Sequence, residues 1–215
     1  MSSPSCPLCE TVDCMDLGFI EQKRFHQCDQ CRLIFLDPSM RLSPEQEKAR
    51  YLLHENHVDD PGYRTFLSPI LEEVLKRFPM PVRGLDFGSG PGPALAKMFD
   101  ERSYPVDIYD PYFSPNPKVF QQTYDFITCT EVAEHLYQPY QEFSTLVPLL
   151  RNGGILAILT SMFENQKDFA TSHYHRDPTH VCFFGKATFT YLAQKLGQTV
   201  AFPRPNVALL IKSNQ

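Results

Sequence analysis

A glycine-rich run reads Leu85-Asp86-Phe87-Gly88-Ser89-Gly90-Pro91-Gly92. The apolar residues at 84–87 predict a β-strand before it, and the apolar periodicity of 94–99 predicts a helix after it. Glycines allow a tight turn and a close approach of the backbone to a ligand, and a helix N-terminus offers unpaired N–H groups. The run is therefore typical of a nucleotide-type binding site, with a plain tight turn as the alternative.

Outward from this run, short apolar strands alternate with helices. We expect strands at 84–87, 106–109, 126–129, 155–160, 199–202 and 207–212, and helices at 94–99, 140–150 and 186–196, the last two capped by Asn152-Gly153-Gly154 and Gly197. This alternation predicts an α/β fold, a Rossmann-like, doubly wound and mostly parallel sheet. Asp110 ends the second strand, 22 residues after Gly88, where an acidic side chain accepts hydrogen bonds from ribose hydroxyls in such folds.

The run at 85–92 resembles the first motif of class I S-adenosylmethionine (SAM)-dependent methyltransferases. A dinucleotide fingerprint fits worse, because it has two residues between its second and third glycines where this chain has one. The segment 124–136 is similar to the family's fourth-strand motif, with Glu131-Val132-Ala133-Glu134-His135 at the strand exit. The resemblance covers residues 82–212, including a closing antiparallel hairpin, and implies SAM as the cofactor. The cofactor-binding residues that it implies are Asp86 at the methionine end, Gly88, Ser89 and Gly90 along the turn, Asp110 at the sugar, and Glu131 near the methionine or ribose.

One segment departs from the family's pattern. Tyr124 follows Asp110 by only 14 residues, too few for the usual helix and third strand. We expect residues 111–123, which contain three prolines, to form a loop or a short edge strand. How this chain contacts adenine is therefore left open.

Two Cys-x2-Cys pairs lie near the N-terminus, Cys6 with Cys9 and Cys28 with Cys31, with 18 residues between them. This spacing predicts a tetrahedral site for structural zinc, because four thiolates leave no open position for chemistry. Metal binding also supplies the folding free energy that so small a module lacks. Free buried cysteines, or His26 as a substitute ligand, are the alternatives. The module is similar to the zinc-ribbon heads of some bacterial methyltransferases that act on small molecules such as sugar nucleotides.

The chain divides into three predicted parts, which are a zinc-ribbon-like module at 1–40, a helical linker or lid at 41–81, and the methyltransferase domain at 82–215. Helix in the middle part is indicated by the N-cap sequence Ser43-Pro44-Glu45 and by apolar residues that recur at helical spacing between Phe66 and Phe78. A turn at 54–63 is expected to interrupt it.

A histidine-rich loop follows the strand at 155–160 and contains His173, His175 and His180. Loops at the carboxyl ends of strands build the active sites of α/β proteins. Because histidine titrates near neutral pH, we predict His180 first, and then His173 and His175, as the catalytic residues, acting as base or orienting the acceptor. Two alternatives stay open. In the first, His180 caps the following helix or is a core histidine. In the second, the loop binds a second metal through His173, His175 and Cys182.

Composition limits the class of function. A net charge of -5 and a pI of about 5.8 argue against binding by neutralisation of phosphates, so nucleic acid is not an expected partner. No apolar stretch approaches the roughly 18 residues of a membrane span, and the N-terminus does not resemble a signal peptide. We therefore expect a cytoplasmic protein with no membrane partner.

Together these features predict a SAM-dependent methyltransferase that transfers a methyl group to a small, polar acceptor by in-line displacement. The expected cofactors are SAM and structural Zn²⁺. An RNA methyltransferase with a zinc ribbon and a non-catalytic binding module of the same fold are the alternatives.

Overall fold

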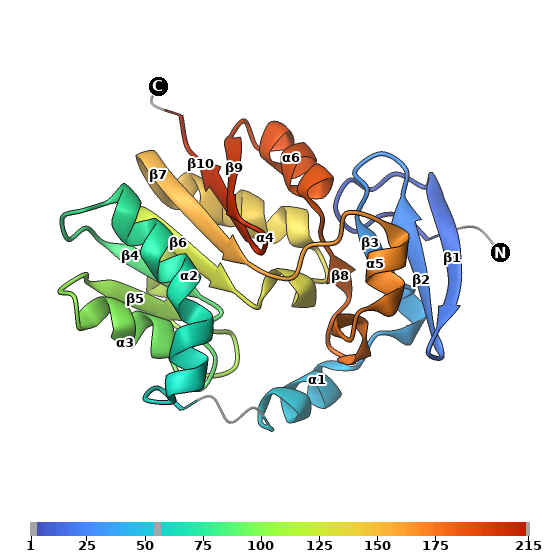
Figure 1. Ribbon diagram of the computed structural model, residues 1–215, viewed down its shortest axis with the longest axis horizontal. Helices are drawn as coiled ribbons and strands as arrows, with labels where there is room; N and C mark the ends of the chain where they lie inside the picture. Colours follow the sequence, from blue (N-terminus) through green and yellow to red (C-terminus); the bar gives the residue numbers. More distant parts are fainter. Residues whose placement is uncertain (1–3, 54–56, 214–215) are drawn as a thin grey trace.

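The computed structural model describes residues 4–53 and 57–213, which form two sheets joined by helices (Figure 1). The larger sheet has six strands in the order β5-β4-β6-β7-β10-β9. Along the chain they are β4 (Gly84–Phe87), β5 (Val106–Tyr109), β6 (Tyr124–Thr130), β7 (Leu150–Leu159), β9 (Thr199–Arg204) and β10 (Val207–Ile211). The pairs β4-β5, β4-β6 and β6-β7 are parallel, whereas β10 runs antiparallel to β7 and β9. The predicted α/β class, the mostly parallel sheet and the closing antiparallel hairpin are confirmed.

Helices cover both faces of this sheet. One face is covered by α2 (Pro61–Arg77) and α3 (Ala94–Asp100), and the other by α4 (Pro139–Leu146) and α6 (Lys186–Lys195). Successive residues of a strand point to opposite faces, so Ile155 of β7 packs in the α2–α3 layer and the next residue packs in the α4–α6 layer. Among the described residues, no helix has both the length and the apolar character needed to cross a bilayer.

The predicted helix at 140–150 is shorter in the structure. It ends at Leu146, and Val147–Leu149 form a 3₁₀ turn, because Pro148 has no N–H group to donate to an α-helical hydrogen bond. β7 already begins at Leu150, so Gly153, with a φ of 75°, lies at an irregularity of the strand rather than at a helix end. The prediction of a glycine cap there is wrong.

The segment 111–123 contains no strand. A single bridge joins Asp110 and Ser114, and Pro117–Gln121 form a 3₁₀ turn. This confirms the predicted loop and leaves β5 as an edge strand of the larger sheet.

Helix α1 (Pro44–Tyr51) begins as predicted. The Ser43 side chain and Gln46 form a capping box at its start. Part of the turn predicted at 54–63 lies outside the described residues, because these resume at His57. Pro61 and Gly62 belong to α2 rather than to the turn, since the Asp60 carboxylate caps that helix by accepting the Tyr63 N–H at 2.6 Å.

The smaller sheet contains the N-terminal residues and one strand from the other end of the chain. Its order is β1-β2-β3-β8, built from β1 (Cys14–Ile20), β2 (Lys23–Cys28), β3 (Ile34–Leu36) and β8 (Cys182–Phe183). β3 and β8 pair antiparallel, with Phe35 opposite Cys182. The predicted domain boundary at residue 40 stays a prediction. The first three strands of the smaller sheet lie before it, and the fourth, β8, directly follows the histidine-rich loop.

Aromatic packing holds the smaller sheet against the rest of the chain. The Phe25 ring lies 5.0 Å from Phe169 of α5 (Gln166–Thr171) and 5.7 Å from Phe183 of β8, measured between ring centroids. These residues belong to the same hydrophobic core as β4 and β6. The N-terminal module is thus fixed in place by a shared core.

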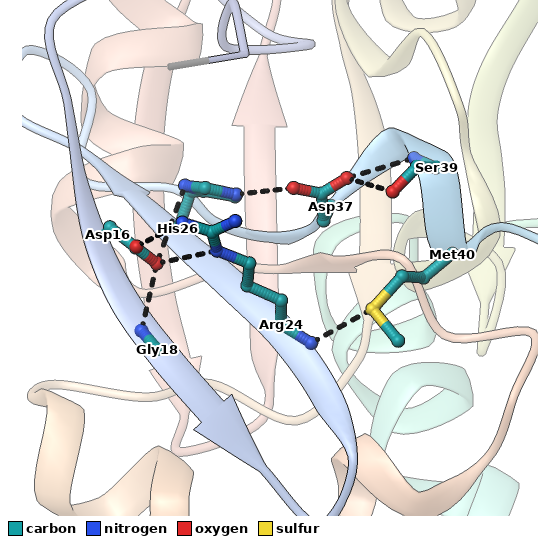
Figure 2. A network of polar contacts seen from close by, with 7 residues as sticks. All are labelled: Asp16, Gly18, Arg24, His26, Asp37, Ser39 and Met40. Atoms are coloured by element: carbon teal, nitrogen blue, oxygen red, sulfur yellow. Dashed lines mark hydrogen bonds and ion pairs between the residues drawn. The ribbon is translucent and has the colours of Figure 1, made fainter. Parts of the chain in front are cut away.

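His26 belongs to a polar network on this sheet (Figure 2). Its Nε2 lies 2.9 Å from the Asp37 carboxylate, and its ring stacks on Phe35. Arg24 donates two hydrogen bonds to Asp16 beside it. His26 is therefore a structural partner of Asp37, and the alternative of His26 as a zinc ligand is wrong.

Candidate active site

A cavity of about 540 Å³ opens at the carboxyl ends of β4, β5 and β6. Its wall includes the glycine turn 88–91, the loop 109–113 and residues 130–132, while α1 and α2 contribute Glu47, Tyr51, Tyr63 and Phe66 from the opposite side. This volume suits a cofactor together with a small partner. The carboxyl ends of the strands are also where open α/β sheets bind their ligands.

The glycine turn has the conformation that the sequence predicts. Gly88 and Gly90 have φ values of 78° and 63°, in the left-handed region that favours glycine. A Cβ on Gly88 would lie 2.2 Å from a methyl group of Val132, whereas a Cβ on Gly90 would meet no atom within 4 Å. Both residues line the cavity, and at Gly90 no side chain lies between the backbone and the open space of the cavity.

Two hydroxyl groups in the cavity wall have no partner. The Oγ of Ser89 and the Oγ1 of Thr130 are buried and make no hydrogen bond among the described residues. Burial of a polar group without a partner costs about 1–3 kcal/mol, so such groups commonly mark a ligand's position. Ser89 was predicted from the sequence to face the cofactor, and its orphaned hydroxyl fits that role.

Asp110 lies against the glycine turn, as predicted. One carboxylate oxygen accepts the Gly90 N–H at 3.0 Å, and the other accepts the N–H groups of Tyr112 and Phe113 at 2.8 and 3.0 Å. Asp110 therefore ties the turn to the shortened loop, and it brings both aromatic residues to the cavity wall. Their rings are candidates for the adenine contact that the sequence left open.

Asp86 lies beneath the turn and does not line the cavity. Its carboxylate accepts a 2.8 Å hydrogen bond from the Thr128 hydroxyl and another from the Ala96 N–H in α3. Burial raises the pKa of Asp86 to about 6, and these hydrogen bonds oppose that shift. A negative charge at Asp86 therefore costs free energy unless a cation lies nearby.

Asp86→Asn should change how stability depends on pH. The folded-state pKa of Asp86 is raised, so its contribution is fully present below about 3.8 and is lost as pH rises through about 6. Relative to the variant, the wild type should lose about 2–3 kcal/mol of unfolding free energy between pH 4 and 7. Denaturant unfolding of both proteins at each pH measures this difference. A constant difference would contradict the burial argument.

A second polar cluster lies deeper in the cavity wall. The Tyr174 hydroxyl donates to Glu134 and lies 3.2 Å from a Glu131 oxygen, and the Thr160 hydroxyl donates to Glu134 at 2.9 Å. Burial first, and then the neighbouring Glu134 charge, raises the pKa of Glu131 to about 8. Glu131 also has a φ of 51°, a strained conformation for a non-glycine residue that tends to occur at functional sites.

His180 and His135 line the same part of the cavity, with ring centroids 4.8 Å apart. The His180 Nδ1 lies 2.7 Å from the Tyr174 carbonyl oxygen, and the His135 Nδ1 lies 3.1 Å from the Thr179 carbonyl oxygen. A carbonyl only accepts, so each Nδ1 is the donor and each neutral ring has its lone pair on Nε2. Burial also lowers the pKa of His180, which favours this neutral form.

The other two predicted histidines lie outside this cavity. His175 is buried between the rings of Phe25 and Phe169, and His173 is exposed at the start of a 3₁₀ turn. Lys23 of β2 holds this loop by donating to the carbonyl oxygens of residues 175–177 at 2.8–3.1 Å. The smaller sheet thereby positions the loop that ends at His180.

The four N-terminal cysteines converge. Their sulfur atoms all lie within 4.8 Å of one another, with Cys6–Cys31 at 3.5 Å and Cys9–Cys28 at 3.4 Å. In a tetrahedron with Zn–S bonds of about 2.3 Å, sulfur atoms are about 3.8 Å apart, so the arrangement fits zinc. The cluster is remote from the cavity and suggests a structural metal.

Several site residues were not predicted from the sequence. Glu134 of the polar cluster is one of them, and α1 contributes Glu47, which accepts hydrogen bonds from Tyr51 and Tyr112. The spacing of Glu131, Glu134 and His135 within a few residues was the available indication. Contacts to Tyr174 and α1 join segments tens of residues apart, so only the folded chain brings them together.

The charge of the cavity wall is strongly one-sided. Within the described parts of the chain, no lysine or arginine lines it. Apart from tyrosines, its ionisable side chains are four carboxylates and two imidazoles, from Glu47, Asp110, Glu131, Glu142, His135 and His180. Such a wall attracts cations and disfavours phosphates.

Comparisons with known proteins agree with this geometry. Residues 57–201 match the model of a family described as a methyltransferase domain. The solved structures with a similar fold include an O-methyltransferase family protein from Burkholderia thailandensis, with 14% identity, a TM-score of 0.52, and coverage of 71% of this chain and 57% of that one. They also include 1,6-didemethyltoxoflavin-N1-methyltransferase from the same organism, solved with bound 1,6-didemethyltoxoflavin and S-adenosylhomocysteine (SAH). It is 15% identical, with a TM-score of 0.52, and the match covers 93% of this chain and 99% of that one. This chain thus spans little more than half of the first structure and nearly all of the second. No curated protein matches the sequence.

Proposed function

Because the chain belongs to the methyltransferase-domain family and is a SAM-dependent methyltransferase, we propose that it methylates a small, polar acceptor by in-line displacement. The observation that supports this most is the backbone of Gly90, which is tied to Asp110 and faces a carboxylate-lined cavity with no side chain in between. SAM supplies an electrophilic methyl group on a positively charged sulfur. Carboxylates suit such a cation, and the limited volume suits a small acceptor.

The roles proposed for the cofactor-side residues follow from their positions. Gly88 and Gly90 let the backbone approach the cofactor, and the unpartnered hydroxyl of Ser89 would hydrogen-bond to it. Asp110 would accept from the sugar while holding the turn. Two further acidic residues, Asp86 beneath the turn and Glu131 at the wall, would accept hydrogen bonds from the ammonium end of the methionine portion, whose positive charge would favour their ionised forms.

For the acceptor side we propose His180 as the residue that acts on the acceptor. Its Nε2 has the lone pair of the neutral ring, which suits it to accept a proton or to orient a polar group. His173 and His175 lie outside the cavity, so we assign them no contact with the acceptor. Much of the rate enhancement would come from alignment of two bound reactants, which removes up to about 7–11 kcal/mol of barrier.

The rival acceptor class, RNA, is disfavoured by the cavity wall. Phosphate binding depends on lysine and arginine, and none lines the cavity within the described residues. A non-catalytic module would share every feature of the cofactor side, so only turnover separates it from an enzyme.

Two measurements test the proposal. Calorimetry of the purified, zinc-loaded protein should show one SAH site per chain, and radiolabelled SAM should label a low-molecular-weight fraction of cell extract. Labelling should change less than about twofold between 50 and 200 mM salt, whereas transfer to RNA should fall by about a thousandfold or more. Absence of SAH binding would contradict the cofactor site, and label found only in RNA would contradict the acceptor class.

A further inference from the structure

Glu134, His135 and His180 form a cluster of metal-ligating side chains, in which the two histidines line the cavity and Glu134 lies behind them. A carboxylate oxygen of Glu134 and one ring nitrogen of each histidine all lie within 4.8 Å of one another. The sequence left open a second metal on His173, His175 and Cys182. Within the described residues those three do not form a metal-ligating group, and the cluster that does form includes none of them but takes His180 from the same loop.

Backbone carbonyl groups fix the orientation of both histidine rings. His180 donates its Nδ1–H to the Tyr174 carbonyl, and His135 donates its Nδ1–H to the Thr179 carbonyl. Metal-ligating histidines nearly always donate their other ring N–H to a carbonyl or carboxylate, which holds the ring and raises the basicity of the ligating nitrogen. Both rings therefore have the outer hydrogen bond of a metal ligand, with Nε2 as the ligating atom.

The carboxylate is held in the same way. Glu134 is fully buried and accepts from Thr160 and Tyr174, one on each oxygen, and each oxygen keeps a second lone pair. Glu131 lies beside it, sharing the Tyr174 hydroxyl. Among the described residues, no lysine or arginine lines the cavity beside this pair of carboxylates, and the neighbouring His180 ring is neutral. A divalent cation would supply the missing positive charge.

The cluster is open on one side. Glu131, His135 and His180 line the cavity, whereas Glu134 lies behind them. A cation held by two imidazoles and one or two carboxylates therefore faces the space left for the acceptor. Catalytic metal sites, unlike structural ones, keep a coordination position that the protein does not fill, and a substrate oxygen or a water molecule occupies it.

We propose that Glu134, His135 and His180, with Glu131 beside them, bind one divalent transition-metal ion that takes an oxygen of the acceptor as a further ligand. The acceptor part of this inference rests on the proposed function. The cation would occupy the Nε2 lone pair, so His180 would orient the acceptor through the metal rather than accept its proton. Mixed nitrogen and oxygen ligands suit Mn²⁺, Fe²⁺ or Zn²⁺, whereas the four thiolates select zinc.

Mn²⁺ binding tests the site without any cofactor. Mn²⁺ prefers oxygen and nitrogen ligands and does not displace zinc from thiolates, and its free ion is counted by electron paramagnetic resonance. Wild-type protein that carries one zinc ion per chain, the amount that the four thiolates hold, should bind one Mn²⁺ per chain. Glu134→Gln and His180→Ala should each weaken binding at least tenfold, and His173→Ala, in the same loop but exposed and outside the cluster, should leave it unchanged.

Three results would overturn the site. They are no binding by the wild type at millimolar Mn²⁺, equal binding by both cluster variants, or equal loss in His173→Ala. SAH binding by each variant reports whether it folds, and if Glu134→Gln fails that control, His180→Ala decides. A wild type that binds SAH but not Mn²⁺ would end the metal inference and leave the methyltransferase intact. One that binds Mn²⁺ but not SAH would count against the proposed function alone.

Discussion

Gly90→Val is expected to weaken SAH binding by at least a hundredfold, about 2.7 kcal/mol of binding free energy. A side chain at this position points into the open space of the cavity, because no atom lies within 4 Å of the Cβ. The valine side chain would occupy the space in which we expect the cofactor to contact the backbone of the turn. Calorimetric titration with SAH measures the loss directly and requires no knowledge of the acceptor.

A matched control separates cavity blockage from backbone strain. Gly197, at the end of α6, has a φ of 67°, and its Cβ would also meet no atom within 4 Å, but it lies outside the cavity. Gly90→Val and Gly197→Val should therefore lose similar stability, about 1–2 kcal/mol each. Only the first should lose SAH affinity. Near-normal SAH binding by Gly90→Val would place the cofactor elsewhere.

Cys28→Ser is expected to remove the metal from the N-terminal module. Zinc content should fall from one ion per chain to less than about one tenth, because three thiolates bind far more weakly than four. Loss of a structural metal should cost about 4 kcal/mol or more, or roughly 8–16 °C in melting temperature for a chain of this length. Elemental analysis and thermal unfolding measure the two effects, and limited proteolysis should cut between residues 4 and 40.

Cys14→Ser provides the comparison. Cys14 begins β1 opposite Cys28 but is not one of the four converging sulfurs, and its Sγ lies 3.8 Å from the Thr11 carbonyl oxygen. This variant should keep its zinc and its protection from protease. Equal zinc content in the two variants would show that the cluster does not hold the ion.

The larger sheet could be predicted from the sequence because its inner strands, such as β4 and β6, are almost entirely buried and therefore apolar. β4 and β5 appear at their predicted bounds, since short apolar runs between glycines and prolines have few other interpretations. The smaller sheet could not. β2 reads Lys-Arg-Phe-His-Gln-Cys, and its strand character depends on pairing with β1 and β3 and on packing of Phe25 against distant residues.

The candidate site divides in the same way. The glycine turn and Asp110 are local to two neighbouring strand ends, so topology alone brings them together. The cluster around Glu134 joins β6's exit to Tyr174 and His180, some 40 residues later, and no sequence pattern specified that contact. For Asp86, the sequence located the residue correctly but not its burial beneath the turn.

The pairing of Phe35 with Cys182 joins residues about two thirds of the chain apart, and this affects the order in which the smaller sheet can form. Both cysteine pairs precede β8 in the sequence, so the zinc ligands are synthesised before the strand that completes the sheet. The outer edge of β3 stays unpaired until the last sixth of the chain has been synthesised, since β8 is its partner. Until then, the unpaired backbone groups at the edge of β3 are exposed, and other polypeptides can pair with them. Folding of the smaller sheet is therefore completed only when β8 has paired with β3.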